Sequence, residues 1–413
     1  MAEQKNAPQI RVAGFTVEWT KQLLNHYLET SQEKNIDGIY KREDVLSVSG
    51  DYGVVNQIEF KGRSFAGASV CSYGIVHTGD VVYTKSPLKE NPYGIIKTNT
   101  GKAGIVSTLY AVYHPKEFTF PQFVQWYFEN NDRLNHYLTP LVNKGAKNDM
   151  KVSADNALLG TVIFPDYAEQ KAISDSLTHI KNTILQCESR LKKLQTLKAS
   201  MMEKMFPKDG AVAPEVRFNG FSGAWERKYG SELFTAYVDK GHPELPVLSA
   251  TQDAGMVARH GIGKSVFHNT ANEIGYKRVM PGQFVIHLRS FQGGFAHSAV
   301  EGITSPAYTV FGFKEPEKHD DYYWKYVFTS KQFIKRLETV TYGIRDGRSI
   351  SYEEFLTLDF LFPQKEEQTK ICTYLRELDR IIFCVNKNLT SSNPSEKPCW
   401  KKCLSDIGGC YGI

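Results

Sequence analysis

The chain is one unit of roughly 200 residues written twice, and this repeat constrains the fold more than any other feature of the sequence. Residues 7–19 read APQIRVAGFTVEW and residues 213–225 read APEVRFNGFSGAW, so several positions recur at an offset of 206. Further on, GIVSTLYAVY at 104–113 corresponds to GITSPAYTVF at 302–311. Such self-similarity predicts two copies of one domain, related by a pseudo-two-fold internal repeat.

The two copies are alike at their edges and different in their bodies. The stretches 20–75 and 226–278 share little. The segments at 7–19 and 213–225, which lead into the two bodies and which we call the entry segments, share most of their motif residues. We also align Trp126 with Trp324 in an aromatic helix of each body. A variable body on a constant frame indicates two modules with one task and different targets. Ordinary drift after duplication is the alternative.

The motif FPDYAEQKAI at 164–173 poses a choice between a metal site and a helix start. A Pro-Asp followed by an E-x-K triplet is typical of some nucleases. The second copy reads FPQKEEQTKI 198 residues later, where Gln364 replaces Asp166 and Thr369 replaces Lys171. Proline suits the first turn of a helix, and carboxylates there complement the helix dipole. We therefore interpret both motifs as helix starts and predict no metal site.

Each Phe-Pro motif leads into a stretch with apolar residues at alternating steps of three and four. This spacing predicts a coiled-coil seam, with an amphipathic helix on a globular core as the alternative. The natural partner of each helix is the other one. The predicted seam residues are Ile173, Leu177, Ile180, Ile184, Leu191 and Leu194 in the first helix, and Ile371, Leu375, Leu378, Ile382, Val385 and Leu389 in the second.

The C-terminus departs from the repeat. Pro394 and Pro398 stand where the first copy continues its heptads, and a helix interior does not tolerate proline. We expect a frameshifted or unwound tail at 391–413. The predicted fold is therefore mixed α/β, of the α+β type, with bodies at 1–165 and 207–363, long helices at 166–206 and 364–390, and this atypical tail.

Basic and polar loops recur at matched places in both bodies. Lysine and arginine neutralise phosphates, arginine reads guanine, and glutamine reads adenine. The alternative is that these loops are merely solvated. The candidate DNA-binding residues are Lys85, Lys89, Tyr93, Lys97, Lys102, Lys144, Lys147 and Lys151 in the first body, and Arg289, Ser290, Gln292, Arg345 and Arg348 in the second.

Composition and failed motif searches narrow the class further. The net charge of +5 is compatible with nucleic-acid binding but does not demand it. No apolar run reaches the length of a membrane span, and the seven cysteines form no disulfide or zinc pattern, so we expect a soluble cytoplasmic protein. We find no P-loop, no H-E-x-x-H pattern and no methyltransferase motif. The chain is predicted to be a reader rather than an enzyme.

The duplicated design, the entry segment VRFNGFSGAWE at 216–226, the two FP…EQ helix starts and the run VIHLRSFQGGFAHS from 285 resemble the specificity subunit of type I restriction–modification enzymes. The resemblance covers residues 7 to about 389. It implies that each body is a target-recognition domain reading one half of a split double-stranded DNA site. It also implies that the two helices pair antiparallel and set the gap between the halves.

The same resemblance implies partners and their cofactors. Two modification subunits would dock on this chain and methylate adenine with S-adenosylmethionine, and restriction subunits would cut DNA with ATP and Mg. The chain itself would bind no cofactor and catalyse nothing. Two other classes stay open on the residues alone: a duplicated coiled-coil scaffold that binds only proteins, and a self-contained DNA-modifying enzyme.

Overall fold

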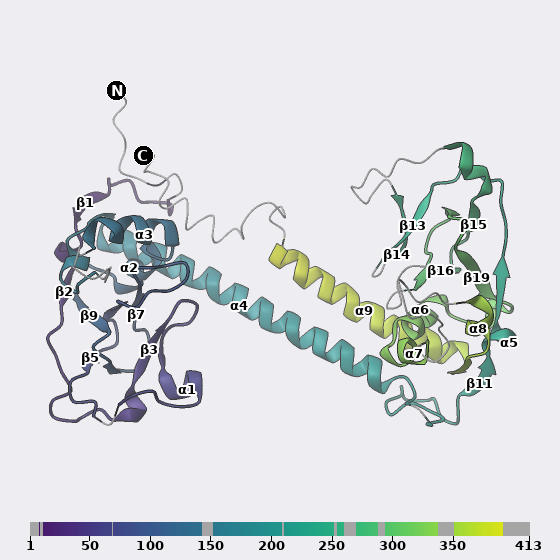
Figure 1. Cartoon of the computed structure of the whole chain (residues 1–413), viewed down its shortest axis with the longest axis horizontal. Helices are drawn as coiled ribbons and strands as arrows, with labels where there is room; N and C mark the ends of the chain where they lie inside the picture. Colours follow the sequence, from purple (N-terminus) through teal and green to yellow (C-terminus); the bar gives the residue numbers. More distant parts are fainter. Residues whose placement is uncertain are drawn as a thin grey trace. The chain divides into compact units, whose positions relative to one another are not determined.

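The computed structural model describes residues 8, 11–67, 69–142, 152–208, 210–251, 254–259, 270–287, 294–337 and 351–390 (Figure 1). These residues form two compact units. Unit 1 covers the described residues up to Glu188 together with those from Asn388 on, and unit 2 covers those from Ser189 to Lys387. Helices and strands are mixed in both units, which confirms the predicted α+β class.

Unit 1 is built on a four-stranded antiparallel sheet with strand order β2-β9-β6-β7. The central strand β6 is buried along its whole length, as expected for a strand covered on both faces. Three further antiparallel pairs surround the sheet: β1-β10, β3-β4 and β5-β8. The strands are β1 (Thr20–Leu23), β2 (Leu28–Thr30), β3 (Leu46–Ser49), β4 (Gly53–Asn56), β5 (Gly74–Val76), β6 (Val81–Thr84), β7 (Ile95–Thr98), β8 (Gly104–Val106), β9 (Tyr110–Pro115) and β10 (Thr161–Phe164).

Unit 2 repeats this arrangement strand for strand. Its four-stranded sheet has the order β12-β19-β16-β17, and the pairs β11-β20, β13-β14 and β15-β18 surround it. The strands are β11 (Glu226–Tyr229), β12 (Phe234–Tyr237), β13 (Leu248–Thr251), β14 (Gly255–Ala258), β15 (Lys277–Val279), β16 (Phe284–Ile286), β17 (Phe295–His297), β18 (Gly302–Thr304), β19 (Thr309–Phe313) and β20 (Asp359–Phe362). The sequence repeat is therefore a repeat of topology.

The strand register repeats as well. Leu28 pairs with Pro115 in unit 1, and Phe234 pairs with Phe313 in unit 2. The first members are 206 residues apart and the second members 198, which are the two offsets found in the sequence motifs. Insertions between these strands thus change loop lengths without changing the pairing.

Short helices cover the sheets of each unit. Those of unit 1 are α1 (Gln57–Lys61), α2 (Pro121–Tyr127) and α3 (Asn131–Leu138), with 3-10 turns at Leu24–His26, Arg42–Asp44, Thr139–Leu141 and Asn156–Leu158. Those of unit 2 are α5 (Gly230–Leu233), α6 (Asp321–Thr329), α7 (Lys331–Leu337) and α8 (Tyr352–Leu356), with 3-10 turns at Thr270–Gly275 and Pro316–Lys318.

The aromatic helices α2 and α6 correct one sequence alignment. Trp126 donates its ring N–H to Thr178 of the long helix that follows, whereas Trp324 is fully buried in the core of unit 2. The residue of α6 that contacts a long helix is Tyr326, whose hydroxyl donates to Asp379. Trp126 therefore corresponds to Tyr326 and not to Trp324. The two tryptophans coincide in sequence, but they face opposite sides of their helices.

Two long helices follow the Phe-Pro motifs: α4 (Tyr167–Lys204) with 38 residues and α9 (Lys365–Thr390) with 26. At ~1.5 Å per residue, α4 alone is about 57 Å long. The predicted tail at 391–413 lies outside the described residues. Within the described part of the chain, no helix is long and apolar enough to cross a membrane.

The predicted seam residues are placed with one exception on the less exposed side of these helices. Ile173 and Leu177 are buried in the core of unit 1, but Ile180 is 39% exposed, because Trp126 contacts the neighbouring Thr178 and Lys181 instead. The other nine seam residues are buried or half-buried. They are half-buried Ile184, Leu191, Leu194, Ile382, Val385 and Leu389, and buried Ile371, Leu375 and Leu378.

Inside unit 2, the end of α4 lies against α9 (Figure 1). Lys198 stands at a seam position of α4, and its Nζ lies 2.5 Å from Oδ1 of Asp379 in α9. Met205, one residue after the end of α4, packs in the same buried cluster as Ile371 near the start of α9. Contacts thus run in opposite directions along the two helices, as in an antiparallel pair. Knobs-into-holes packing along the seam stays a prediction.

The core of unit 2 holds a histidine that makes folding sensitive to acid. His319 is 7% exposed and stacks on Phe313 at 4.5 Å between ring centroids. Burial lowers the pKa of His319 from 6.5 to about 4. The unfolded chain therefore binds this proton first. Stability is complete above pH 6.5 and falls as the pH drops towards 4, by roughly 3 kcal/mol for this group.

We expect His319→Phe, which keeps an aromatic ring in this site, to remove that loss. Chemical unfolding of both proteins between pH 7 and pH 4 measures it. The wild type should lose more stability than the variant over this interval. Equal losses would show that His319 is accessible to protons in the folded unit.

Candidate nucleic-acid interface

Each entry segment is tied to its long helix by a two-bond ion pair. In unit 1, Nε of Arg11 donates to Oε1 of Glu169 at 2.9 Å, and Nη2 donates to Oε2 at 2.5 Å. In unit 2, the same atoms of Arg217 donate to Glu367 at 2.8 and 2.7 Å. Both carboxylates are almost fully buried. Paired, hydrogen-bonded burial of this kind is the condition under which proteins tolerate a charge inside.

The glutamine of each FP…EQ motif ties a third segment to the same point. Oε1 of Gln170 accepts the backbone N–H of Phe120 at 2.9 Å, and its Nε2 donates to the carbonyl of Pro165 at 2.9 Å. Gln368 repeats both bonds, with Asp320 at 3.0 Å and Pro363 at 2.8 Å. The glutamine therefore connects the start of the long helix to the start of the aromatic helix. We call each Arg, Glu and Gln set the helix anchor of its unit.

These contacts favour the helix-start interpretation of the Phe-Pro motif. The carboxylate of Glu169 is engaged by Arg11 and by the ring N–H of Trp19, and Lys171 pairs with Asp175 at 2.7 Å along the helix. The E-x-K side chains therefore serve the helix and its anchor. Among the described residues, no group of three or more histidine, cysteine or carboxylate side chains could hold a metal ion.

The structure divides the candidate lysines of unit 1 between two opposite ends of the sheet. Lys85, Lys89 and Tyr93 lie in or beside the loop between β6 and β7. Lys102 lies in the next loop, between β7 and β8. Because β6 and β7 are antiparallel, consecutive loops of this meander lie at opposite ends of β7. The predicted set is therefore not one continuous surface.

Only part of this set is available to a ligand. Lys89 and Lys102 are exposed. Lys85 is half-buried, and its Nζ donates to the carbonyl of Thr108 at 2.9 Å. Tyr93 is half-buried against the core, and its carbonyl accepts the hydroxyl of Tyr83. Lys89 and Lys102 are thus the best-placed phosphate contacts of the predicted residues in this part of unit 1.

Lys97 does not fit a contact with DNA. It belongs to β7 and is 5% exposed, and its Nζ lies 2.5 Å from Oε2 of Glu129 after α2. The sequence placed it in a basic loop, but the strand continues through this position and turns the side chain inward. Breaking such a pair would leave a buried charge uncompensated. We therefore remove Lys97 from the candidate contacts.

The other candidates lie outside the described residues. These are Lys144, Lys147, Lys151, Arg289, Ser290, Gln292, Arg345 and Arg348. Their assignment to DNA binding stays a prediction.

One group of exposed cations was missed in the sequence. Lys61 and Arg63 lie at the end of α1 and just after it, next to exposed aromatic rings. The short run FKGRSF at 60–65, in which basic and aromatic residues alternate, is the signal that could have identified them.

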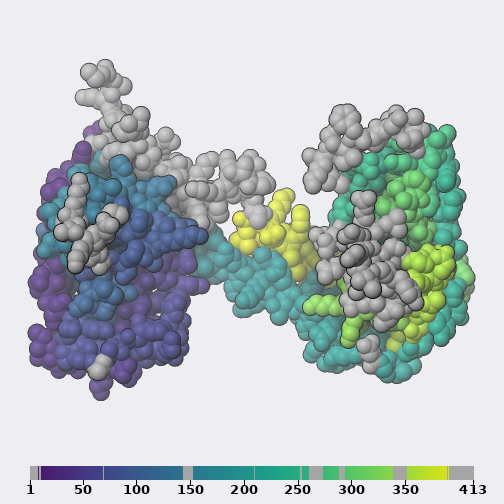
Figure 2. Space-filling model, viewed as in Figure 1, coloured from purple at the N-terminus to yellow at the C-terminus, as the bar shows by residue number. Residues whose placement is uncertain are grey.

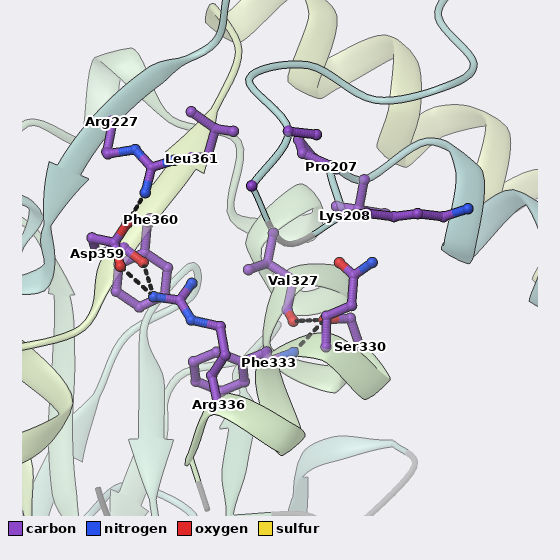
Figure 3. Close-up of a pocket in the computed structure, with 14 residues that line it drawn as sticks. Pro207, Lys208, Arg227, Val327, Ser330, Phe333, Arg336, Asp359, Phe360 and Leu361 are labelled. Carbon is purple, nitrogen blue, oxygen red and sulfur yellow. Dashed lines mark hydrogen bonds and ion pairs between the residues drawn. The ribbon is translucent and has the colours of Figure 1, made fainter. Parts of the chain in front are cut away.

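A cavity of about 240 Å³ lies in unit 2 beside the segment that follows α4 (Figure 3). Two guanidinium groups, from Arg227 and Arg336, converge there on the carboxylate of Asp359 in β20. Arg336 lies 2.5 Å from that carboxylate and also donates to the backbone carbonyl of Asp359 at 2.6 Å. Phe206, Val327 and Phe333 form apolar walls. This cluster joins β11, α7 and β20 and provides a second electrostatic support for unit 2.

The fold is similar to that of solved S subunits of type I restriction–modification systems. The S subunit from M. genitalium matches with a TM-score of 0.53 and 11% identity over 98% of this chain and 99% of that one. This likeness establishes the fold: two tandem domains joined by helices.

Two other solved chains match at lower TM-scores. The HsdS subunit from Thermoanaerobacter tengcongensis gives a TM-score of 0.44 and 13% identity over 96% of this chain and 97% of that one. A chain from work on complex assembly and conformational transition of the type I R-M system gives 0.42 and 15% over 98% and 99%. No family model and no curated protein matches the sequence.

We expect that breaking the helix anchor lowers the stability of unit 2 strongly. Arg217→Ala leaves the carboxylate of Glu367 buried without its partner, so we expect a loss of about 3–5 kcal/mol in the free energy of unfolding. Replacing both partners, in Arg217→Met with Glu367→Gln, should restore much of it. Arg380→Ala removes an exposed pair with Glu377 and is the control, with an expected change within about 0.5 kcal/mol.

Urea unfolding of the three variants gives these values. If Arg217→Ala costs no more than Arg380→Ala, then the anchor does not hold the entry segment in solution.

Proposed function

We propose that the chain is the DNA-specificity subunit of a type I restriction–modification complex. The observation that carries the proposal is the strand-for-strand duplication of the whole chain in a fold similar to an S subunit along nearly its full length. Two copies of one module suit a DNA site with two recognised halves. The differing bodies on identical anchors suit two halves of different sequence.

Each unit would read its half-site through loops that project from its sheet. In unit 1, exposed Lys89 and Lys102 would contact phosphates, which position a protein on DNA without specifying sequence. Base reading would fall to residues such as Arg289 and Gln292. Mildly basic overall charge supports such a role.

The long helices would serve as the ruler between the half-sites. Helix α4 is continuous over 38 residues, or about 57 Å, and DNA advances ~3.4 Å per base pair. Lys198 would help to set the register of α4 on α9, because its Nζ pairs with Oδ1 of Asp379 at 2.5 Å.

Chemistry would come from partners. Two modification subunits would dock on the helices and methylate adenine with S-adenosylmethionine, and restriction subunits would use ATP and Mg to cut DNA. This chain would bind none of these cofactors and would catalyse no step. The complex would work in the cytoplasm, where its DNA is.

Site selection tests the proposal directly. The full chain, co-expressed with a cognate modification subunit, is used to capture duplexes from a randomised library, and the captured DNA is sequenced. We expect a split motif with two defined ends and a gap of fixed length. A single continuous motif, or capture without sequence preference, would contradict a bipartite reader. Capture of partner proteins without any DNA would favour a protein scaffold instead.

Lengthening the ruler should lengthen the gap. Four residues inserted after Cys187 in α4 add about one turn, or ~6 Å, which corresponds to roughly two base pairs. The same selection should then return both half-sites unchanged with a longer gap. A matched insertion after Gly210, beyond the end of α4, is the control and should leave the gap as it was. An unchanged gap after the helix insertion would refute the ruler.

A further inference from the structure

Three aromatic side chains of unit 1 are displayed to solvent within one short segment. Tyr52 is 68% exposed in the turn between β3 and β4, Phe60 is 37% exposed in α1, and Phe65 is 58% exposed in the loop after α1. Isolated exposed rings are common, but a group of them on one segment indicates an interaction site.

Two cations lie over these rings. Nζ of Lys61 is 4.7 Å from the ring centroid of Phe60, and Cζ of Arg63 is 4.7 Å from that of Phe65. Tyr52 and Phe60 lie 5.3 Å apart between centroids. Among the described residues, neither cation forms an ion pair with a carboxylate. We call Tyr52, Phe60, Lys61, Arg63 and Phe65 the aromatic–cation surface.

The backbone under this surface is held in place by side-chain hydrogen bonds. Asn56 caps the start of α1 by accepting the backbone N–H groups of Ile58 and Glu59. Gln57 donates to Ser47 at 2.9 Å and accepts the backbone N–H of Phe65 at 2.6 Å. The rings are therefore presented by a fixed backbone, which lowers the entropy lost when a ligand binds.

A left-handed glycine ends α1 between the two cations. Gly62 has a φ of 74°, and its backbone N–H donates to the carbonyl of Ile58 at 2.7 Å. This cap turns the chain sharply between the two cations: Lys61 lies over the ring of Phe60 before the turn, and Arg63 lies over the ring of Phe65 after it.

The surface adjoins the long helix. Nζ of Lys181 in α4 donates to the backbone carbonyl of Asp51 at 3.4 Å, next to Tyr52. Figure 1 places α1 at the edge of unit 1 opposite β1, and Figure 2 shows the purple segments of this edge at the molecular surface.

We propose that the aromatic–cation surface binds the sugar–phosphate backbone of double-stranded DNA without reading its sequence. This inference rests on the proposed function and adds a second, sequence-independent contact to unit 1. Unpaired cations favour a polyanion, since an ordinary protein surface would have to supply two matched carboxylates. Flat exposed rings add contact with the sugars between phosphates.

Binding of a mixed-sequence duplex to the full chain tests the proposal. The probe is a labelled duplex of about 30 base pairs, titrated by fluorescence anisotropy between about 50 and 200 mM salt. The double variant Lys61→Ala with Arg63→Ala should bind about tenfold more weakly at the low-salt end. The slope of log K against log salt should become shallower by roughly 1–2, because fewer counterions are released.

Three further variants test separately the contribution of a ring, the effect of a nearby negative charge, and the effect of a lysine elsewhere on unit 1. Tyr52→Ala should weaken binding a few-fold with an unchanged salt slope, because it removes a ring and no charge. Glu59→Gln, which removes the exposed carboxylate of α1, should strengthen binding. Lys21→Ala, on exposed β1, is the matched control and should leave binding as in the wild type. Thermal unfolding of all variants should stay close to the wild type, since these side chains are exposed.

The outcomes separate this inference from the proposed function. If the wild type binds the duplex and the double variant binds equally well with the same slope, the surface assignment is wrong and the proposed function stands. If the double variant keeps DNA binding but loses co-purification with the modification subunit, the surface is a protein interface and the proposal is overturned. If the wild type shows no salt-dependent binding at all, both fail together.

Discussion

A buried arginine–glutamate pair is the interaction on which each half of this chain depends. The pair joins residues about 150 positions apart, Arg11 to Glu169 and Arg217 to Glu367, and so closes each unit at the start of its long helix. The neighbouring glutamine fixes the start of the aromatic helix to the same point. Because both carboxylates are almost fully buried, loss of the arginine alone would leave a buried charge without its partner, at a large cost. Entry segment, sheet and long helix therefore keep one geometry, while the intervening body is free to vary.

This division leaves two bodies of one topology with unlike surfaces. The strand order and register of the two sheets coincide, yet the segments between the strands differ in length and charge. Unit 1 carries an exposed group of rings and cations at α1, while unit 2 carries a cluster of two arginines and one aspartate around a cavity. Constant anchors and variable loops fit the proposed reader of two different DNA half-sites.

The sequence predicted the repeat, the mixed fold and the starts of both long helices, because these depend on local patterns. It did not predict the Arg–Glu pair, since no spacing rule links residues so far apart. The sequence wrongly predicted an exposed Lys97. A lysine next to a turn is usually exposed, and the sequence does not show that Glu129, from another element, pairs with it in the folded unit. The sequence aligned Trp126 with Trp324 because both are tryptophans. The hydrogen bonds of Trp126 and Tyr326 to the long helices show that the correct alignment of the two aromatic helices is shifted by two residues. The candidate loops in unit 2 could be named from the sequence but lie outside the described residues.

Base-resolution mapping of methyladenine tests the central claim most directly. The chain is expressed with a cognate modification subunit in a host that lacks adenine methylation of its own. We predict methylation within one split motif with two defined ends and a fixed gap, and none when either protein is expressed alone. Methylation by this chain without a partner, or methylation outside any split motif, would contradict the account of a non-catalytic reader built from two anchored modules.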